Sequence, residues 1–158
     1  MSKVRVGVAG VGALGMMHAR HINAIQDAEL VAVCDGMPEL VEKSKTEFDV
    51  PFGYAGFEEM AASGKIDGVV LATPIATHKE QIKVAVEQKL HIFCEKPVGK
   101  TTEECYEIQD ILASHDKIFT VGFMRRYDPS YAEAMKKYAK VLSGNLSFSG
   151  DTAWIHMM

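Results

Sequence analysis

The sequence predicts an α/β domain of the doubly wound (Rossmann) class, with a parallel β-sheet covered by helices on both faces. Three observations lead to this prediction. Short apolar runs alternate along the chain with segments of helical spacing, a glycine-rich turn directly follows the first apolar run, and an aspartate closes the second. At 158 residues, with 47% hydrophobic and 24% charged residues, the chain has the length and composition of one globular domain with a core.

The first strand and helix come at the start of the chain. Residues 4–9 form a short, β-rich apolar run that ends in glycines. Apolar side chains and two histidines then recur at helical spacing over residues 14–25, which predicts an amphipathic helix. Residues 30–34 are a second apolar run and predict the next strand, and residues 38–48 are a charged segment rich in good helix formers.

The middle of the chain continues the alternation with shorter elements. Residues 52–55 predict a short strand, and residues 57–62 a short helix. Residues 68–72 are continuously apolar, as is typical of a parallel strand buried on both faces. Apolar side chains at helical spacing over residues 82–90 predict the helix that follows.

The last third of the chain predicts two more strands, at residues 91–94 and 118–122. Between them, Thr101 is followed by early glutamates, which favours a capped helix that runs to Leu112. Residues 131–142 predict a final amphipathic helix. Parallel sheets of this kind bind ligands beyond the carboxyl ends of their strands, so the residues just after each strand are the candidate site.

Composition excludes several classes of partner. Lys and Arg total 17 against 21 Asp and Glu, for a net charge of −4, so we expect neither nucleic acid nor an anionic membrane as a partner. No apolar run approaches the roughly 20 residues that cross a bilayer, and the N-terminus leads straight into a strand, so we expect a cytoplasmic protein. Cys34, Cys94 and Cys105 suggest neither a disulfide framework nor a zinc site, and we expect them to be reduced and buried.

A dinucleotide fingerprint, G-x-G-x-x-G, opens the first predicted helix. Gly10 allows a tight turn, Gly12 lets the backbone approach a pyrophosphate, and Gly15 permits close helix–strand packing. The free N–H groups of this first helical turn, those of Ala13 and Leu14 included, would receive the phosphates. The motif therefore predicts a dinucleotide site.

Asp35 lies 20 residues after Gly15 at the end of the second strand, where a carboxylate can accept both ribose hydroxyls of an adenosine. Its charge would repel a 2′-phosphate, and Gly36 and Met37 supply no cation to bind one. NAD is therefore expected as the cofactor in preference to NADP.

Two further groups of polar residues follow strands. After the fourth strand, Thr73, Pro74 and His78 could reach the ribose or nicotinamide side of the cofactor, while Thr77 could equally be a helix cap, and both interpretations stay open.

After the fifth strand, Glu95 and Lys96 precede Pro97, and the Lys96 amine could hydrogen-bond a substrate hydroxyl and help its proton leave. Pro97 leaves the isomer of its peptide bond undetermined. Cys94 lies in an apolar strand, which favours an inert buried thiol over a nucleophile.

Two histidines, His18 and His21, stand three apart on one face of the first helix. No carboxylate or cysteine near them in the sequence completes a metal site, so we expect them to line the core or a crevice and predict no metal.

Taken together, these motifs resemble the Gfo/Idh/MocA oxidoreductase family, over about residues 3–142. The segments that carry the resemblance are the glycine fingerprint with Asp35, the Thr73-Pro74 pair with His78, the Glu-Lys-Pro triplet at 95–97, and Gly-Phe-Met-Arg-Arg-Tyr-Asp at 122–128. The last segment is similar to the inositol 2-dehydrogenase branch in particular.

The resemblance implies an NAD-dependent oxidoreductase that oxidises a ring hydroxyl of a cyclic polyol such as myo-inositol and passes the hydride to nicotinamide. Lys96 would orient the reacting hydroxyl, and Met124 and Arg125 would border the polyol. In the family a second domain supplies most substrate contacts and an Asp-x-x-x-His pair with the general base, and residues 143–158 match neither. We therefore expect a dinucleotide-binding domain at 1–122, then a crossover loop, terminal helix and atypical tail at 123–158, truncated before the substrate domain and inactive alone.

A second hypothesis is a non-catalytic module that binds or senses NAD, or that mediates an interaction. The tail contains apolar side chains with no clear place in the sheet, among them Leu146, Phe148 and Trp154, so self-association through a face left exposed is a further expectation.

Overall fold

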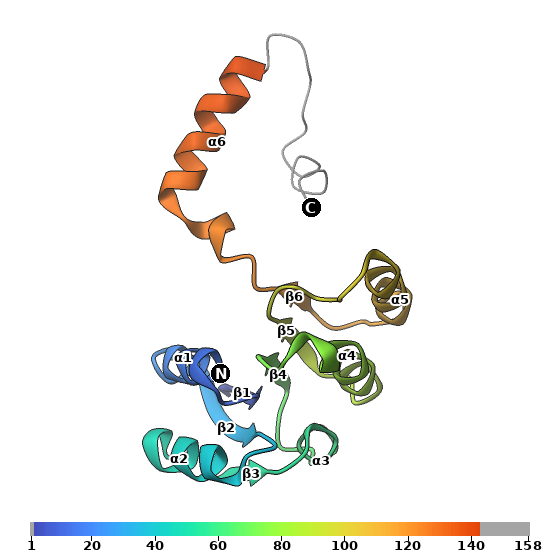
Figure 1. Ribbon diagram of the computed structural model, residues 1–158. Helices are drawn as coiled ribbons and strands as arrows, with labels where there is room; N and C mark the ends of the chain where they lie inside the picture. The colour runs from blue at the N-terminus through green and yellow to red at the C-terminus, as the bar shows by residue number, and fades with distance from the viewer. Residues whose placement is uncertain (1, 143–158) are drawn as a thin grey trace. The chain divides into compact units, whose positions relative to one another are not determined.

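The computed structural model describes residues 2–142 (Figure 1). The chain divides into two compact units, Met1–Gly122 and Phe123–Met158. The first unit contains the whole β-sheet and five of the α-helices, and the second contains a short 3-10 helix and the last α-helix, α6.

The sheet of the first unit has six strands in the order β3-β2-β1-β4-β5-β6, and all neighbouring pairs are parallel. The strands are β1 (Val4–Ala9), β2 (Ala28–Cys34), β3 (Phe52–Tyr54), β4 (Gly68–Leu71), β5 (His91–Cys94) and β6 (Phe119–Val121). The chain runs outward from β1 to β3 and then returns to the other side of β1 with β4. The crevice at which a doubly wound sheet binds ligands therefore lies beyond the ends of β1 and β4.

Helices cover both faces of this sheet, as the sequence predicts. They are α1 (Ala13–Asn23), α2 (Pro38–Phe48), α3 (Phe57–Ala62), α4 (His78–Glu87) and α5 (Thr102–Leu112). In Figure 1, α1 and α2 lie on one side of the strands, and α3, α4 and α5 on the other. The predicted doubly wound parallel sheet is confirmed.

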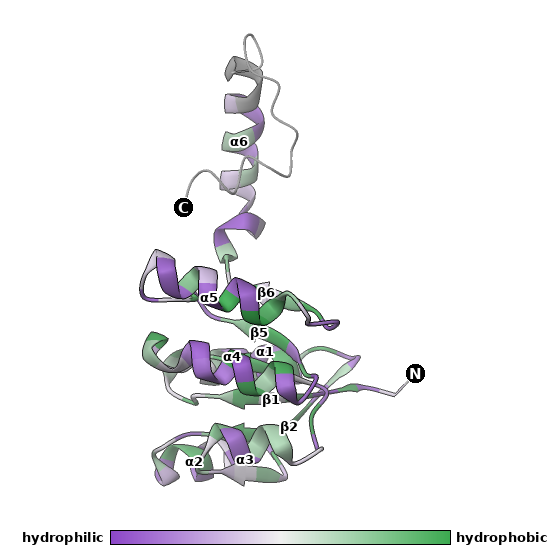
Figure 2. Cartoon of the chain, turned by 90° about the vertical axis from the view of Figure 1, so that its right-hand side faces the viewer, coloured by the Kyte–Doolittle hydropathy of each residue, from purple (hydrophilic) through white to green (hydrophobic). Residues whose placement is uncertain are grey.

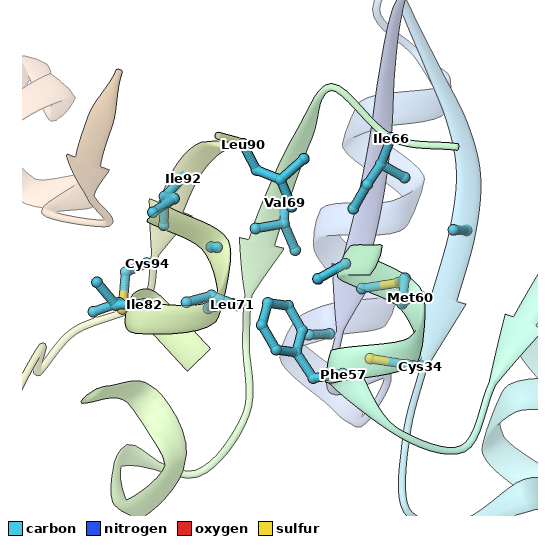
Figure 3. Close-up of a cluster of buried hydrophobic side chains, with 14 of the residues drawn as sticks. Cys34, Phe57, Met60, Ile66, Val69, Leu71, Ile82, Leu90, Ile92 and Cys94 are labelled. Atoms are coloured by element: carbon cyan, nitrogen blue, oxygen red, sulfur yellow. The ribbon is translucent and has the colours of Figure 1, made fainter. Parts of the chain in front are cut away.

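Two hydrophobic clusters fill the space between the sheet and its two helical layers. One joins α1 and α2 to the sheet through residues such as Val8, Ala19 and Val33. The other joins α3, α4 and α5 to the opposite face, and Figure 3 shows Phe57, Met60, Leu71 and others meeting within it. The strands are mostly hydrophobic, whereas hydrophilic residues occupy the outward faces of α4 and α5 (Figure 2). This division is what burial on both faces of a parallel sheet requires.

Local signals fix several helix ends. Thr101 caps α5, because its hydroxyl oxygen accepts the backbone N–H of Glu104 at 3.2 Å, as predicted. The helix expected over residues 82–90 instead starts at His78 and ends at Glu87, and Lys89 has a left-handed φ of 55° that an α-helix cannot continue through.

No helix among residues 2–142 is long and apolar enough to cross a membrane.

In the second unit, a 3-10 helix (Met124–Tyr127) leads into α6 (Pro129–Leu142). Asp128 stands before α6, and its carboxylate accepts the Ser130 backbone N–H at 2.9 Å, which is the bond of a helix N-cap. The expectation of self-association through the tail concerns residues outside those that the structure describes.

One cysteine differs from expectation. Cys34 and Cys94 are buried and reduced as predicted, but Cys105 is exposed. The prediction that all three are buried is wrong for Cys105. This cysteine lies in α5, an outer helix that buries Ile108 against the sheet and leaves Cys105 exposed to solvent.

Candidate functional site

The turn between β1 and α1 is built from glycines that the fold requires. Gly10 has a φ of 80°, and a Cβ added to it would lie 2.7 Å from the carbonyl oxygen of Ala72. A Cβ at Gly15 would collide with the carbonyl oxygen of Gly10. These two glycines therefore let α1 pack against the turn and let the turn pack against the end of β4.

Gly12 is different, because a Cβ added to it would meet no atom within 4 Å. It precedes α1, and no side chain caps the helix. The first-turn N–H groups of residues 13–15 have no acceptor within the helix, so they are free to bind an anion. No contact within residues 2–142 requires a glycine at position 12, and the open space in front of it suits a phosphate that approaches the backbone.

Asp35 lies beside this turn, half-buried at the end of β2. Its Oδ2 accepts the backbone N–H of Val11 at 2.9 Å, and its Oδ1 accepts the N–H of Met37 at 3.0 Å. Because a carboxylate offers about four acceptor positions, two remain for other donors such as ribose hydroxyls. The N–H groups of Val11 and Met37 fix the carboxylate next to the glycine turn.

A cavity of about 220 Å³ joins these residues to the loop after β4. Gly10, Asp35, Thr73, Pro74 and Gln81 are among the residues that line it. Four of the residues singled out in the sequence, from three separate segments, thus surround one hollow beyond the ends of β1, β2 and β4. The open glycine backbone, the unfilled acceptor positions of Asp35 and this hollow fit the adenosine and phosphate parts of a dinucleotide.

The loop after β4 is held by hydroxyl hydrogen bonds. Thr73 Oγ1 donates to Gln81 Oε1 at 2.5 Å, and Thr77 Oγ1 donates to the carbonyl oxygen of Pro74 at 2.9 Å. Thr77 immediately precedes α4, yet its side chain makes no capping bond to that helix. Thr77 therefore stabilises the loop at the cavity and does not act as a side-chain helix cap.

His78 lies behind the same loop, with only 1% of its surface exposed. Its Nε2 is 3.0 Å from the carbonyl oxygen of Thr73, and its Nδ1 is 3.0 Å from that of Pro97. The ring ties the loop after β4 to the loop after β5. Burial leaves it no surface to present to a cofactor, so it supports both loops from beneath.

The Glu-Lys-Pro triplet follows β5 at the same edge of the sheet. The Lys96 side chain is exposed and has no hydrogen-bond partner among residues 2–138, whereas Glu95 is buried. Glu95 Oε1 lies 2.9 Å from His18 Nε2 on α1, and Glu95 Oε2 accepts the Lys96 backbone N–H at 3.1 Å. The peptide bond between Lys96 and Pro97 is cis. The link between His18 and Glu95 is not evident from the sequence, in which the two residues are 77 positions apart.

Met124 and Arg125 belong to the second unit, within the 3-10 helix. Met124 is exposed, and the Arg125 guanidinium lies over the ring of Tyr131, 4.9 Å from its centroid. This cation–π contact orients the arginine at the start of α6.

The buried cysteines are not nucleophiles. Burial raises the pKa of Cys34 and that of Cys94 to about 12 each, so both remain protonated thiols near neutral pH. Among residues 2–142, no cluster of three or more His, Cys, Asp or Glu side chains could hold a metal ion.

A larger hollow of about 520 Å³ lies elsewhere, on the sheet face beside α1. Its walls are mostly apolar and include Val4, Ile25 and Ile118, near the amino ends of the strands. Its lining includes His18, His21 and His91, but it lies toward the amino ends of the strands, away from the glycine turn, so the smaller cavity at the carboxyl ends is the candidate nucleotide site.

Comparison with known proteins identifies the family of the chain. The family model described as "Oxidoreductase family, NAD-binding Rossmann fold", of the Gfo/Idh/MocA group, matches residues 4–123. Inositol 2-dehydrogenase of Acidothermus cellulolyticus is 35% identical over 130 residues, which are 81% of this chain and 38% of that protein. Inositol 2-dehydrogenase of Agrobacterium fabrum is 38% identical over 132 residues, which are 81% of this chain and 39% of that protein.

A solved structure is similar as well. Scyllo-inositol dehydrogenase of Lactobacillus casei, with bound NAD(H) and scyllo-inositol, superposes with a TM-score of 0.82 at 34% sequence identity. The match covers 88% of this chain and 42% of that one. The chain thus spans about two fifths of the length of the relatives that it matches.

Proposed function

The chain belongs to the Gfo/Idh/MocA oxidoreductase family, and we propose that it is the NAD-binding part of an enzyme that oxidises a ring hydroxyl of a cyclic polyol, of the myo-inositol kind. The cofactor is NAD, as in the family. The observation that supports the proposal most is the joint placement of the Gly10 turn that leads into α1, Asp35 and the loop after β4 around one cavity. The likeness to enzymes named for inositol supports the substrate class.

Different residues of the site bind different parts of the cofactor. The first-turn N–H groups of α1 bind the pyrophosphate, and Gly12 leaves it room to approach. Asp35 accepts the ribose hydroxyls at its two remaining acceptor positions. Thr73 and Pro74 bound the cavity on its other side, and His78 holds their loop in place.

Lys96 is the residue assigned to the chemistry. When bound, NAD accepts the hydride that leaves the substrate carbon. The exposed Lys96 amine would hydrogen-bond the reacting hydroxyl, and the proton of that hydroxyl would pass to the general base that the second domain supplies in the family. Glu95 holds the Lys96 backbone through its 3.1 Å hydrogen bond.

Calorimetric titration of residues 1–158 with NAD and NADP tests the cofactor assignment. NAD should bind, and more tightly than NADP, because Asp35 repels a 2′-phosphate. Absence of binding by either nucleotide would refute the proposal.

Spectrophotometry of NAD reduction with myo-inositol tests whether residues 1–158 are active on their own. In the relatives, the matched region is only about two fifths of the enzyme, so residues 1–158 alone should bind NAD without turnover. Turnover by these residues alone would contradict that expectation and would also exclude a non-catalytic module that only binds NAD.

A further inference from the structure

His18 of α1 and Glu95 of the loop after β5 form a buried pair. Their side chains are 16% and 11% exposed, and His18 Nε2 lies 2.9 Å from Glu95 Oε1. His18 stands one turn after Gly15 and one turn before Ile22, both buried, so it is on the sheet-facing side of α1. Its ring also meets the ring of Phe93 edge to face, with centroids 5.3 Å apart.

The Glu95 carboxylate is enclosed on its other sides. A Cβ added to Gly122, at the end of β6, would lie 3.1 Å from Glu95 Oε1, so the glycine leaves just enough room for the carboxylate. Glu95 Oε2 accepts the Lys96 backbone N–H. Burying a carboxylate is costly unless it is hydrogen-bonded or paired, so the orientation of the Glu95 carboxylate depends on these few donors. Among residues 2–138, His18 is the only histidine or cationic side chain within ion-pair distance of Glu95.

These contacts connect two functional parts of the site that are far apart in the sequence. The N-terminus of α1 is the proposed pyrophosphate site, and His18 lies on the same rigid helix. From His18 the contacts continue to the Glu95 carboxylate and on to the backbone of Lys96, the residue assigned to the chemistry.

We propose that His18 is a positioning residue, which orients the Glu95 carboxylate and through it fixes the Lys96 backbone relative to the nucleotide-binding end of α1. The inference rests on the function proposed above for Lys96. Without the His18 donor, Glu95 would turn toward solvent, the bond to the Lys96 N–H would be lost, and the lysine would no longer have one defined position.

Amide hydrogen exchange at Lys96, measured by NMR on the cofactor-free protein, tests the inference. In His18→Ala, the Lys96 amide should exchange at least tenfold faster than in the wild type. His18→Gln places an amide donor near the position of Nε2 and should restore most of the protection. The Asp67 amide, which donates to the Arg5 carbonyl oxygen at 2.8 Å and lies away from Glu95, serves as an internal reference that should not change.

His21→Ala is the matched control, because His21 is exposed on the same helix and its imidazole has no hydrogen-bond partner among residues 2–138. It should leave the Lys96 amide unchanged. A purely stabilising role of His18 would raise exchange at Lys96 and at the distant Asp67 reference together, and that result would overturn the inference.

His18→Phe keeps the test decisive if His18→Ala does not fold. The phenyl ring fills a similar volume but has no hydrogen-bond donor for the Glu95 carboxylate, so the Lys96 amide should again lose protection. An unchanged Lys96 amide in folded His18→Phe would also overturn the inference. Failure of the wild type to bind NAD would refute the proposed function instead, since the exchange measurement needs no cofactor.

Discussion

Substitution of Gly12 by alanine distinguishes the effect of this glycine on folding stability from its effect on NAD binding. Gly12 has φ −66° and ψ −166°, an extended conformation open to any residue, and an added Cβ meets no atom within 4 Å. The protein should therefore tolerate Gly12→Ala, with a gain in the free energy of unfolding of about 0.4–1 kcal/mol from the less flexible unfolded chain. Gly10→Ala should destabilise, because of its positive φ and the 2.7 Å approach to Ala72.

The same Gly12→Ala substitution should weaken NAD binding. The new methyl group would occupy the space through which the pyrophosphate approaches the α1 N-terminus, and loss of one hydrogen bond to a charged group costs about 1.5–3 kcal/mol. That corresponds to a Kd for NAD roughly 10- to 150-fold higher. Calorimetry gives the Kd, and thermal unfolding gives the stability.

A matched control is Gly56→Ala, at the N-cap of α3, where the nearest atom to an added Cβ is 3.6 Å away. Gly56→Ala controls for the effect of an added methyl group on stability alone, because the neighbours of Gly56, Ala55 and Phe57, line the 220 Å³ cavity. The reasoning fails if Gly12→Ala binds NAD as tightly as the wild type, or if it unfolds at a clearly lower temperature.

Three further predictions concern charges and thiols. Asp35→Asn should weaken NAD binding and narrow the preference over NADP, as measured by paired titrations, because the repelling charge is gone. At pH 8 an alkylating reagent should modify Cys105 quickly and spare the two buried cysteines, since a pKa of about 12 leaves roughly one part in 10⁴ as thiolate. Hydrogen bonds from the Arg5 side chain and backbone lower the pKa of Asp67, so this pair should stabilise the fold above the carboxyl's unfolded pKa of about 4 and lose its effect as the pH falls through the lower folded value.

Each of these predictions has a clear contrary result. An Asp35→Asn protein with an unchanged ratio of NAD to NADP affinity would remove that residue from cofactor selection. Mass spectrometry that finds three equally modified cysteines would contradict the assigned burial. For Asp67, the reference is Asp67→Asn, whose stability disadvantage should shrink on acidification, and a disadvantage that grows on acidification would have the wrong sign.

The parallel sheet could be predicted from the sequence because its strands are buried on both faces. Continuous apolar runs such as residues 68–72 have few other places in a globular fold, and the fingerprint at Gly10 fixes where the first crossover begins. The apolar pattern predicts that the fourth helix continues to residue 90, because Leu90 keeps the helical spacing, but α4 ends at Glu87. The left-handed backbone of Lys89, which prevents the helix from continuing, cannot be recognised from the spacing of apolar residues.

The candidate site was predictable where residues follow strands directly, and less so where it depends on contacts between distant segments. Asp35 and the glycine turn could be placed side by side from topology alone. The burial of His78 between two carbonyl oxygens could not, because its sequence neighbours are those of an ordinary helix start. The pairing of His18 with Glu95 depends on how α1 crosses the sheet, and the only clue in the sequence is that His18 shares the buried face of that helix.

The most direct test of the central claim is an NMR titration of residues 1–158 with NAD. The amide signals of Gly12, Ala13 and Asp35 should shift with a common Kd, since Asp35 lines the cavity and Gly12 and Ala13 follow Gly10, which also lines it, at the start of α1. Signals of Ile25 and Ile118, in the larger apolar hollow, should stay in place. Shifts confined to the apolar hollow, or no shifts at all, would contradict the assignment of the NAD site.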